Sequence, residues 1–177
     1  MRKIVYYVAS SIDGYIAGPE EDISGFLQEG KGIDQYKNDL LEYDSVIMGR
    51  KTYEFGYKYG LKPGMLAYPH MKHFVFSDKL VIEERDPNLE ICPLNLGIID
   101  HIKSQKGSDI YLCGGGTFAS WLLQHKRIDQ LKIKLNPFIQ GSGTAIFEGL
   151  QNNFQLELLH TEAYKDGLFI NTYNINY

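Results

Sequence analysis

Apolar and polar residues follow one another in a pattern that predicts alternating strands and helices over the first two thirds of the chain. Buried strands are predicted where β-branched and aromatic residues run together, and helices where apolar residues recur every three or four positions. The predicted strands are Lys3–Ala9, Ser45–Met48, His73–Ser77 and Asp109–Cys113. The predicted helices are Ile33–Tyr43, Lys51–Phe55, Gly97–Gln105 and Thr117–His125. Turn residues predict loops over Ser10–Asp22 and Gly60–Pro69.

The last third of the chain changes to strands that expose one face to solvent. Leu131–Leu135 alternates apolar residues with lysines, and residues 154–158 alternate in the same way. Lys165-Asp166-Gly167 predicts a hairpin turn into a final strand over residues 168–177. The whole pattern predicts one α/β domain over residues 1–177, with a mostly parallel sheet and antiparallel strands at one edge.

Composition and charge narrow the class of protein. The 177 residues are 44% hydrophobic and carry a formal net charge of −4, which does not favour nucleic acid as a partner. No apolar run reaches the roughly 18 residues that a membrane span requires. The two cysteines form no C-x-x-C motif, which fits a reducing compartment. These features predict a soluble, cytoplasmic, single-domain protein and leave a small anionic ligand possible.

Metal and thiol chemistry have little support in the sequence. His70 and His73 lack further ligands at metal spacing and are interpreted as surface loop histidines, so no metal site is predicted. Cys113 ends a buried strand without a neighbouring histidine, which indicates a structural thiol.

Three glycines separate an apolar strand from a predicted helix. Ile110–Cys113 runs into Gly114–Gly116, and a helical pattern begins after Thr117. Glycine lets backbone approach a ligand closely, and the start of a helix offers unpaired N–H groups. The junction therefore predicts a phosphate site, with a tight turn that binds no ligand as the alternative.

A second strand also ends in a glycine at the start of a helix. Gly49 is followed by Arg50, Lys51 and Thr52, so two cations lie where they oppose the helix dipole. An anionic ligand would compensate them, and a guanidinium suits phosphate. The alternative is that both cations merely solvate a surface turn.

Ligands of open α/β sheets lie beyond the carboxyl ends of the strands. Two phosphate-competent junctions on one sheet therefore predict a dinucleotide with an additional 2′-phosphate. Gly114-x-Gly116-x-x-Ala119 also matches a relaxed form of the doubly wound dinucleotide fingerprint. That fold is rejected, because the motif lies late in the chain and hairpins follow it.

The chain resembles known reductases in several motifs, which occur in the right order. Residues 46–54 (Val-Ile-Met-Gly-Arg-Lys-Thr-Tyr-Glu) and the glycines at 114–116 are similar to the coenzyme motifs of dihydrofolate reductases. Residues 11–17, 128–131 and 136–143 are closer to the reductase domain of the bifunctional riboflavin-biosynthesis deaminase–reductase. The resemblance implies a three-layer α/β/α dihydrofolate reductase-like fold with about eight strands, a homodimer, and a cis peptide between the first two glycines.

The resemblance also implies NADPH as cofactor and assigns residues to it. Ala9, Ile16 and Ala17 would line the nicotinamide. The phosphates and the adenosine would lie against Gly49, Arg50, Lys51, Thr52, Ser77, Gly114, Gly115, Gly116, Thr117 and Phe118. Asp78 departs from the family pattern, since an acid beside Ser77 opposes a 2′-phosphate unless Lys79 offsets it.

Three carboxylates are candidates for the substrate end. Asp34, in the first turn of the first helix, is the candidate for proton supply or substrate anchoring; the alternative is an acid that only complements the helix dipole. Asp13 and Asp22 are weaker substrate candidates. Asp13 also suits a turn cap, and Asp22 is not followed by the Trp of many relatives.

The expected activity is NADPH-dependent transfer of hydride to a pyrimidine- or pterin-type substrate. The resemblance favours 5-amino-6-(5-phosphoribosylamino)uracil reductase. The alternatives are dihydrofolate reductase, a catalytically silent nucleotide-binding relative, and a scaffold that acts through a dimer surface.

Overall fold

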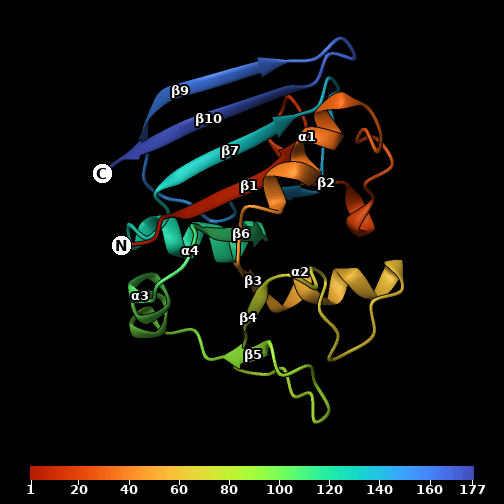
Figure 1. The fold of residues 1–177 in the computed structure, drawn as a ribbon. Helices are drawn as coiled ribbons and strands as arrows, with labels where there is room; N and C mark the ends of the chain where they lie inside the picture. The colour runs from red at the N-terminus through yellow and green to blue at the C-terminus, as the bar shows by residue number, and fades with distance from the viewer.

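The computed structural model describes residues 1–177 and is built on one eight-stranded sheet (Figure 1). Its strands are β1 (Ile4–Ser10), β3 (Ser45–Gly49), β4 (Lys72–Phe76), β5 (Leu89–Cys92), β6 (Ile110–Gly114), β7 (Gln130–Leu135), β9 (Gln155–Ala163) and β10 (Phe169–Asn176). They lie in the order β5-β4-β3-β6-β1-β7-β10-β9. The strands from β5 to β7 are parallel, and β10 and β9 join antiparallel at the edge, as the pattern predicted.

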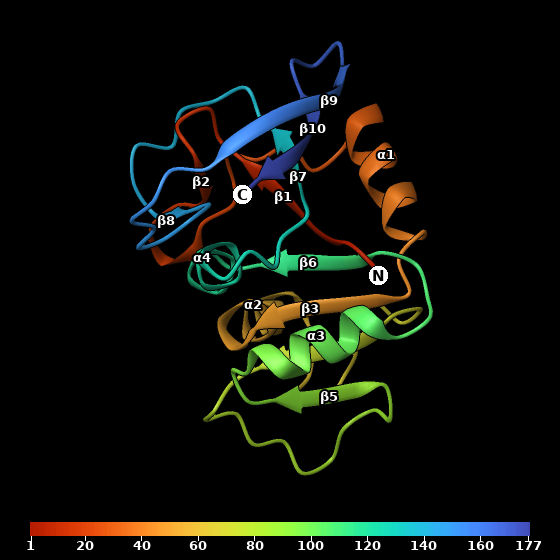
Figure 2. The same cartoon turned by 90° about the vertical axis from the view of Figure 1, so that its left-hand side faces the viewer.

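Helices cover both faces of the sheet. They are α1 (Lys31–Leu40), α2 (Arg50–Phe55), α3 (Leu96–Ser104) and α4 (Gly116–Gln124), with two 3₁₀ turns, η1 (Pro19–Glu21) and η2 (Gly56–Tyr59). One apolar cluster packs α3 and α4 on one face, and a second packs α1 and α2 on the other. Figure 2 shows α1 and α4 on opposite sides of β1. The three-layer α/β/α prediction is confirmed. No helix has the length and apolar character needed to cross a membrane.

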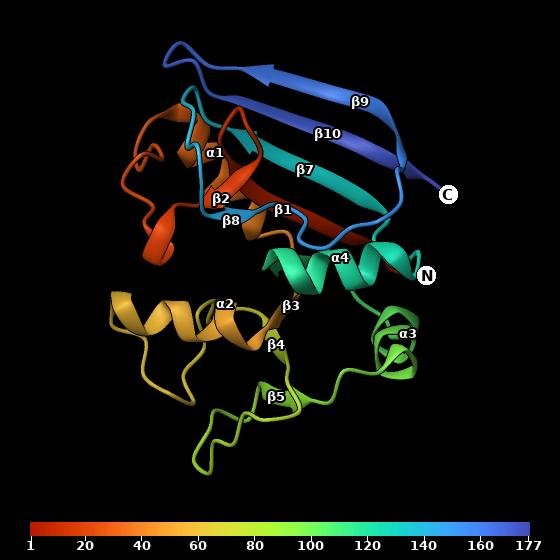
Figure 3. The same ribbon diagram turned by 180° about the vertical axis from the view of Figure 1, so that it is seen from behind.

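The sequence pattern did not predict three short strands, which are β2 (Tyr15–Ala17), β5 and β8 (Thr144–Ala145). The predicted loop Ser10–Asp22 contains β2 and η1, and β2 pairs antiparallel with β8 beside β1 (Figure 3). A Cβ on Gly143 would overlap the carbonyl oxygen of Ala17, and Gly143 has φ +133°. The pairing of β2 and β8 therefore depends on a close backbone approach between distant segments, which residue periodicity does not record.

The predicted solvent-facing side of β7 is covered instead by α1. Lys132 Nζ lies 2.6 Å from the Asp39 carboxylate, and Lys134 is only 8% exposed. Lys134 Nζ lies 4.0 Å from the centre of the Tyr36 ring and has no carboxylate partner. Burial lowers the pKa of Lys134 to about 8. The lysines of β7 thus belong to the interface with a helix and not to a solvated face.

The sequence suggested that His73 is a surface loop residue, but the structure shows it fully buried in β4. Its Nδ1 lies 3.0 Å from the Met71 carbonyl oxygen, and its Nε2 accepts the Tyr68 backbone N–H at 3.1 Å. Burial lowers the pKa of His73, so the ring is neutral at pH 7 and donates from Nδ1. His73 therefore fixes the backbone that carries Tyr68. His70 is exposed and contacts the Leu40 carbonyl.

Candidate active site

The two glycine junctions lie side by side at the carboxyl ends of β3 and β6. These strands pair in parallel, so their ends meet at the same edge of the sheet. A Cβ on Gly49 would lie 3.4 Å from Phe118 Cβ, and one on Gly115 would lie 3.2 Å from Thr52 Oγ1. The Gly114–Gly115 peptide is cis, as the resemblance implied. Each junction therefore packs directly against the helix that follows the other.

A cavity of about 1070 Å³ opens at these junctions, within the size range of cofactor sites. Every residue that the sequence associated with the coenzyme lines it: Ala9, Ile16, Ala17, Gly49, Arg50, Lys51, Thr52, Ser77, Gly114, Gly115, Gly116, Thr117 and Phe118. The cavity thus joins the ends of β1, β3, β4 and β6, which are far apart in the chain.

Charges of both signs border the glycine end of the cavity. Arg50 pairs with Glu54 at 3.1 Å but remains 40% exposed, so its guanidinium can also reach a ligand. At the start of α4, the Thr117 hydroxyl donates to the Glu148 carboxylate at 2.7 Å. The N–H groups of the first turn of α4 and the cations Arg50 and Lys51 suit phosphate, whereas Glu148 opposes it.

The segment after β4 forms a further wall of the cavity. Ser77 Oγ accepts the backbone N–H groups of Lys79 and Leu80 at 3.1 and 3.0 Å. Asp78 accepts the Leu94 N–H at 3.3 Å. A column of stacked rings runs alongside, formed by Phe76, Phe118 and Trp121, with centroid separations of 5.0 and 6.1 Å. This end offers a flat apolar surface beside polar groups.

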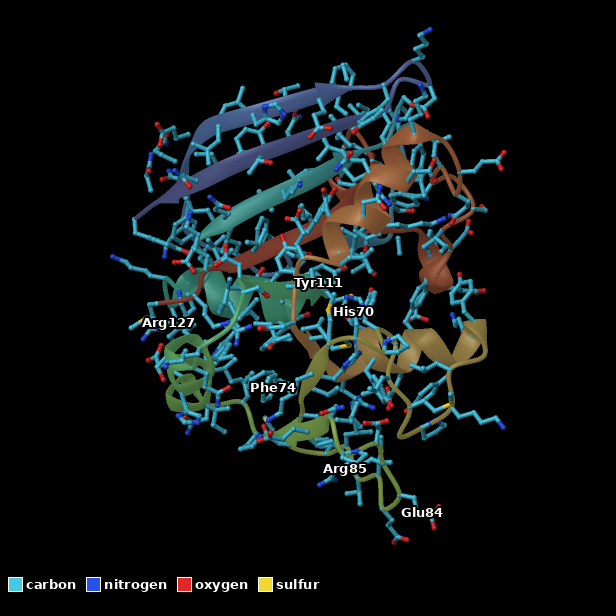
Figure 4. All side chains as sticks on the ribbon, viewed as in Figure 1. His70, Phe74, Glu84, Arg85, Tyr111 and Arg127 are labelled. Atoms are coloured by element: carbon cyan, nitrogen blue, oxygen red, sulfur yellow. The ribbon has the colours of Figure 1, made fainter.

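Sequence reasoning missed four tyrosines that line the cavity, because the aromatic residues were interpreted as core. Tyr7, Tyr36, Tyr68 and Tyr111 all line it, together with Cys113. Figure 4 shows Tyr111 near the centre of the molecule, where β6 crosses it. The signal was present in the residue type: a buried strand that uses tyrosine in place of phenylalanine places a hydroxyl group that needs a partner.

Asp34 does not lie in this cavity. It is exposed on α1 and is not among the residues that line the cavity, whereas Tyr36, two positions later, lines it. Tyr36 and Leu40 pack against the sheet at helical spacing, so Asp34 projects away from it. The structure therefore does not bring Asp34 together with the coenzyme residues, and its proton-supplying role stays a prediction.

The other two candidate acids hold turns outside the main cavity. Asp13 accepts the backbone N–H groups of Gln140 and Gly141 at 2.9 and 2.7 Å and the Ser11 hydroxyl at 2.7 Å. These bonds, led by the one from Gln140, lower the pKa of Asp13 to about 2. Asp22 accepts the Ser24 N–H at 2.9 Å and borders a neighbouring surface hollow.

The comparisons with known proteins agree with this geometry. The RibD C-terminal domain family matches residues 2–170. The chain belongs to this family. YwjB of Bacillus subtilis, an uncharacterized protein, is 30% identical over 167 residues, which cover 92% of each chain.

Solved structures show the same fold at lower identity. A protein of Shewanella sp. PV-4, provisionally named a riboflavin biosynthesis protein, aligns with a TM-score of 0.83 at 23% identity over 100% of both chains. Dihydrofolate reductase from Enterococcus faecalis, in complex with NADP(H), aligns with a TM-score of 0.67 at 15% identity over 98% of this chain and 96% of its own. The RibD family is of reductase type, and the fold is dihydrofolate reductase-like.

Proposed function

We propose that this protein is an NADPH-dependent reductase that transfers hydride to a pyrimidine- or pterin-type ring. Within that class, 5-amino-6-(5-phosphoribosylamino)uracil is the first candidate substrate, in keeping with the RibD family. One observation carries the proposal: both glycine junctions open into a single cavity of about 1070 Å³. That volume accommodates a nicotinamide dinucleotide at one end and a small ring at the other.

The residues present fit NADPH. Gly114, Gly115 and Gly116 line the cavity without side chains, so a bound phosphate can approach their backbone closely. On its other side Gly116 packs against β8, where a Cβ would overlap the Ala145 carbonyl oxygen. The N-terminus of α4 supplies N–H groups for the pyrophosphate, and Arg50 and Lys51 supply cations for the adenosine side. NADPH supplies the hydride when it is bound. The fold's likeness to a dihydrofolate reductase that binds NADP(H) supports the same cofactor.

The nicotinamide end is assigned to Ala9, Ile16 and Ala17. Ala9 is half-buried near the end of β1, and Ile16 and Ala17 belong to β2, which the pairing with β8 holds in place. Small and apolar side chains there exclude water and leave room for a flat ring. Tyr7 and Tyr36 also line the cavity.

Two alternatives rest on particular observations. Dihydrofolate reduction is favoured by the fold alone. A silent NADPH-binding relative is favoured by the exposed position of Asp34, which leaves the substrate end without the expected acid. Both alternatives keep the coenzyme site. The first would reduce dihydrofolate, and the second would turn over no substrate.

Coenzyme binding and turnover are tested separately. NADPH at 100 times its Kd is expected to stabilise the protein by about 2.7 kcal/mol, a rise of several degrees in Tm, and NADH to act more weakly. Oxidation of NADPH is then followed by absorbance with 5-amino-6-(5-phosphoribosylamino)uracil and with dihydrofolate. Stabilisation without turnover of either would indicate the silent relative. Absence of any stabilisation by NADPH would refute the proposal.

A further inference from the structure

Lys134 is a buried charged side chain without an ionic partner. Arg2 and Lys103 are buried to the same degree, but each pairs with a carboxylate. Lys134 Nζ instead lies over the face of the Tyr36 ring, 4.0 Å from its centre, and forms neither an ion pair nor a hydrogen bond. A buried charge without a partner costs stability, and such departures from the rules of stable packing are expected at functional sites.

The Lys134 side chain lies directly behind the wall of the cavity. Lys132 and Lys134 on β7 are the register partners of Tyr7 and Ala9 on β1. Lys132 Nζ lies 4.7 Å from the centre of the Tyr7 ring, so the lysines share the face of the sheet that carries Tyr7 and Ala9. Tyr7, Ala9 and Tyr36 all line the cavity, and Lys134 does not. Its ammonium is therefore separated from the cavity by one layer of side chains, beside Ala9.

The charged groups around Lys134 do not neutralise it. Asp39, the acid that α1 turns toward β7, is engaged by Lys132 Nζ at 2.6 Å and by the Tyr7 hydroxyl at 2.9 Å. Lys37, also on α1, adds a like charge. The positive field of Lys134 therefore extends into the cavity without a local counterion.

The protonation states leave this charge in place at neutral pH. Burial lowers the pKa of Lys134 to about 8, so the ammonium form predominates at pH 7. Burial raises the pKa of Tyr36 to about 12 and that of Tyr7 above its ordinary value, so neither phenol supplies a negative charge. The residue opposite Lys134 on β10 is Ile170, which is apolar.

Building on the proposed function, which assigns Ala9 to the nicotinamide, we propose that Lys134 makes the site select the reduced coenzyme over the oxidised one. The nicotinamide ring is uncharged in NADPH and positively charged in NADP⁺. An ammonium behind Ala9 repels only the charged ring, and burial keeps that repulsion from being screened by salt. The two forms share their phosphates and adenosine, so the rest of the site acts on them equally. Lys134 thus favours release of the oxidised coenzyme and its replacement by NADPH.

The ratio of the two affinities tests this role without a substrate. Calorimetric titration of the full chain at pH 7 is expected to give a Kd for NADPH at least about tenfold below that for NADP⁺. Lys134→Met should reduce this ratio about fivefold, through tighter binding of NADP⁺, with NADPH affinity within about twofold of wild type. Lys134→Arg keeps the charge and should keep the ratio. An unchanged ratio in Lys134→Met, or an equal change for both forms, would overturn the proposal.

A surface lysine and a change of pH provide the controls. Lys37→Met removes an exposed lysine from α1 and should leave the ratio unchanged, because solvent screens its charge. In wild type the preference for NADPH should fall between pH 7 and pH 9.5, as Lys134 loses its proton, and in Lys134→Met it should stay constant. The wild-type measurement does not depend on the folding of any variant, and a wild-type ratio that is constant over this range would contradict the proposal.

The two proposals fail in different ways. Absence of saturable binding of either coenzyme form would refute the reductase, and the role of Lys134 with it. Saturable binding of NADPH, with a ratio to NADP⁺ that neither Lys134→Met nor pH alters, would refute only the role of Lys134.

Discussion

Two charged side chains, Lys134 and Asp78, show how the surroundings of single residues affect stability and binding. Lys134 lies under α1 with an aromatic ring as its closest partner, and Lys37 adds a like charge. Asp78 lies in the cavity wall next to Ser77, where a 2′-phosphate is proposed to bind. A lysine buried under a helix and an acid beside a proposed phosphate site are both unexpected at their positions. Each residue therefore offers a test.

Lys134→Met is expected to stabilise the protein at pH 7 by about 1–4 kcal/mol, because it removes a buried charge that has no ionic partner. The folded-state pKa of about 8 lies below the ordinary value of 10.5. Between these values the unfolded chain keeps the proton that the folded chain has lost, so wild-type stability rises with pH. The advantage of methionine should therefore shrink by pH 10. Urea unfolding at both pH values measures it, and an equal advantage at both would contradict the explanation.

Asp78→Asn is expected to raise the affinity for NADPH roughly fivefold at low salt and to leave NADH affinity unchanged. The change removes repulsion of the 2′-phosphate, and the amide oxygen can still accept the Leu94 N–H. Asp86→Asn is the control, since Asp86 caps a turn through the Asn88 N–H outside the cavity. An unchanged ratio of NADPH to NADH affinity would show that the 2′-phosphate lies elsewhere.

At the scale of elements, α4 and β8 pack so closely that Gly116, the first residue of α4, has no room for a side chain. Gly116 begins α4 without an unusual backbone angle, but its Cα faces the Ala145 carbonyl. Gly116→Ala is expected to cost about 1–3 kcal/mol of stability and to weaken NADPH binding more than tenfold, because β8 must move away from the cavity. Thermal unfolding and a fluorescence titration measure these effects.

Gly60→Ala is the matched control for that change. Gly60 has φ +89° with nothing near its Cβ position, so alanine there adds backbone strain of about 1–2 kcal/mol and no collision. NADPH affinity should be unaffected. A similar loss of NADPH binding in both variants would mean that general destabilisation, and not the contact of α4 with β8, is responsible.

Elements with a long, regular pattern were predictable, and those created by tertiary contact were not. The core strands β1, β3, β4 and β6 and all four helices lie within a few residues of their predicted ranges. β2, β5 and β8 have two to four residues, too few for a period to develop. The lysines of β7 led to the wrong prediction of a solvent-exposed face for a related reason. Alternation shows that a strand has an apolar and a polar face, but it does not show that α1 covers the polar face.

The candidate site also has one part that the sequence predicts and another that only the folded structure brings together. Glycine and cation junctions carry local signals, so the residues at 49–52 and 114–118 could be named from sequence and line the cavity together. Tyr36, Tyr68 and Tyr111 could not be assigned to the cavity from sequence, because they come from three distant segments. Asp34 does not line the cavity, because it lies two residues before Tyr36 on α1, which turns the two side chains apart by about 200°.

At the scale of the whole molecule, β9 leaves one edge of the sheet unpaired. Nearly all of its residues are exposed, including Leu156, Leu158 and Leu159. The homodimer remains a prediction, and this edge is the surface that fits it, since exposed edge strands pair with other chains. Light scattering is expected to give about twice the 20.2 kDa of one chain. Leu158→Lys should shift the protein toward monomer, and the exposed Leu41→Lys should not. A monomeric wild type would contradict this.

The central claim is that the two junctions bind one phosphorylated coenzyme in a common cavity. Trp121 is the only tryptophan and lines that cavity, so its fluorescence reports occupancy directly. Titration with NADPH is expected to quench it to saturation with one site per chain, and Arg50→Ala is expected to weaken binding about tenfold. No saturable quenching, or equal affinity in wild type and Arg50→Ala, would contradict the claim.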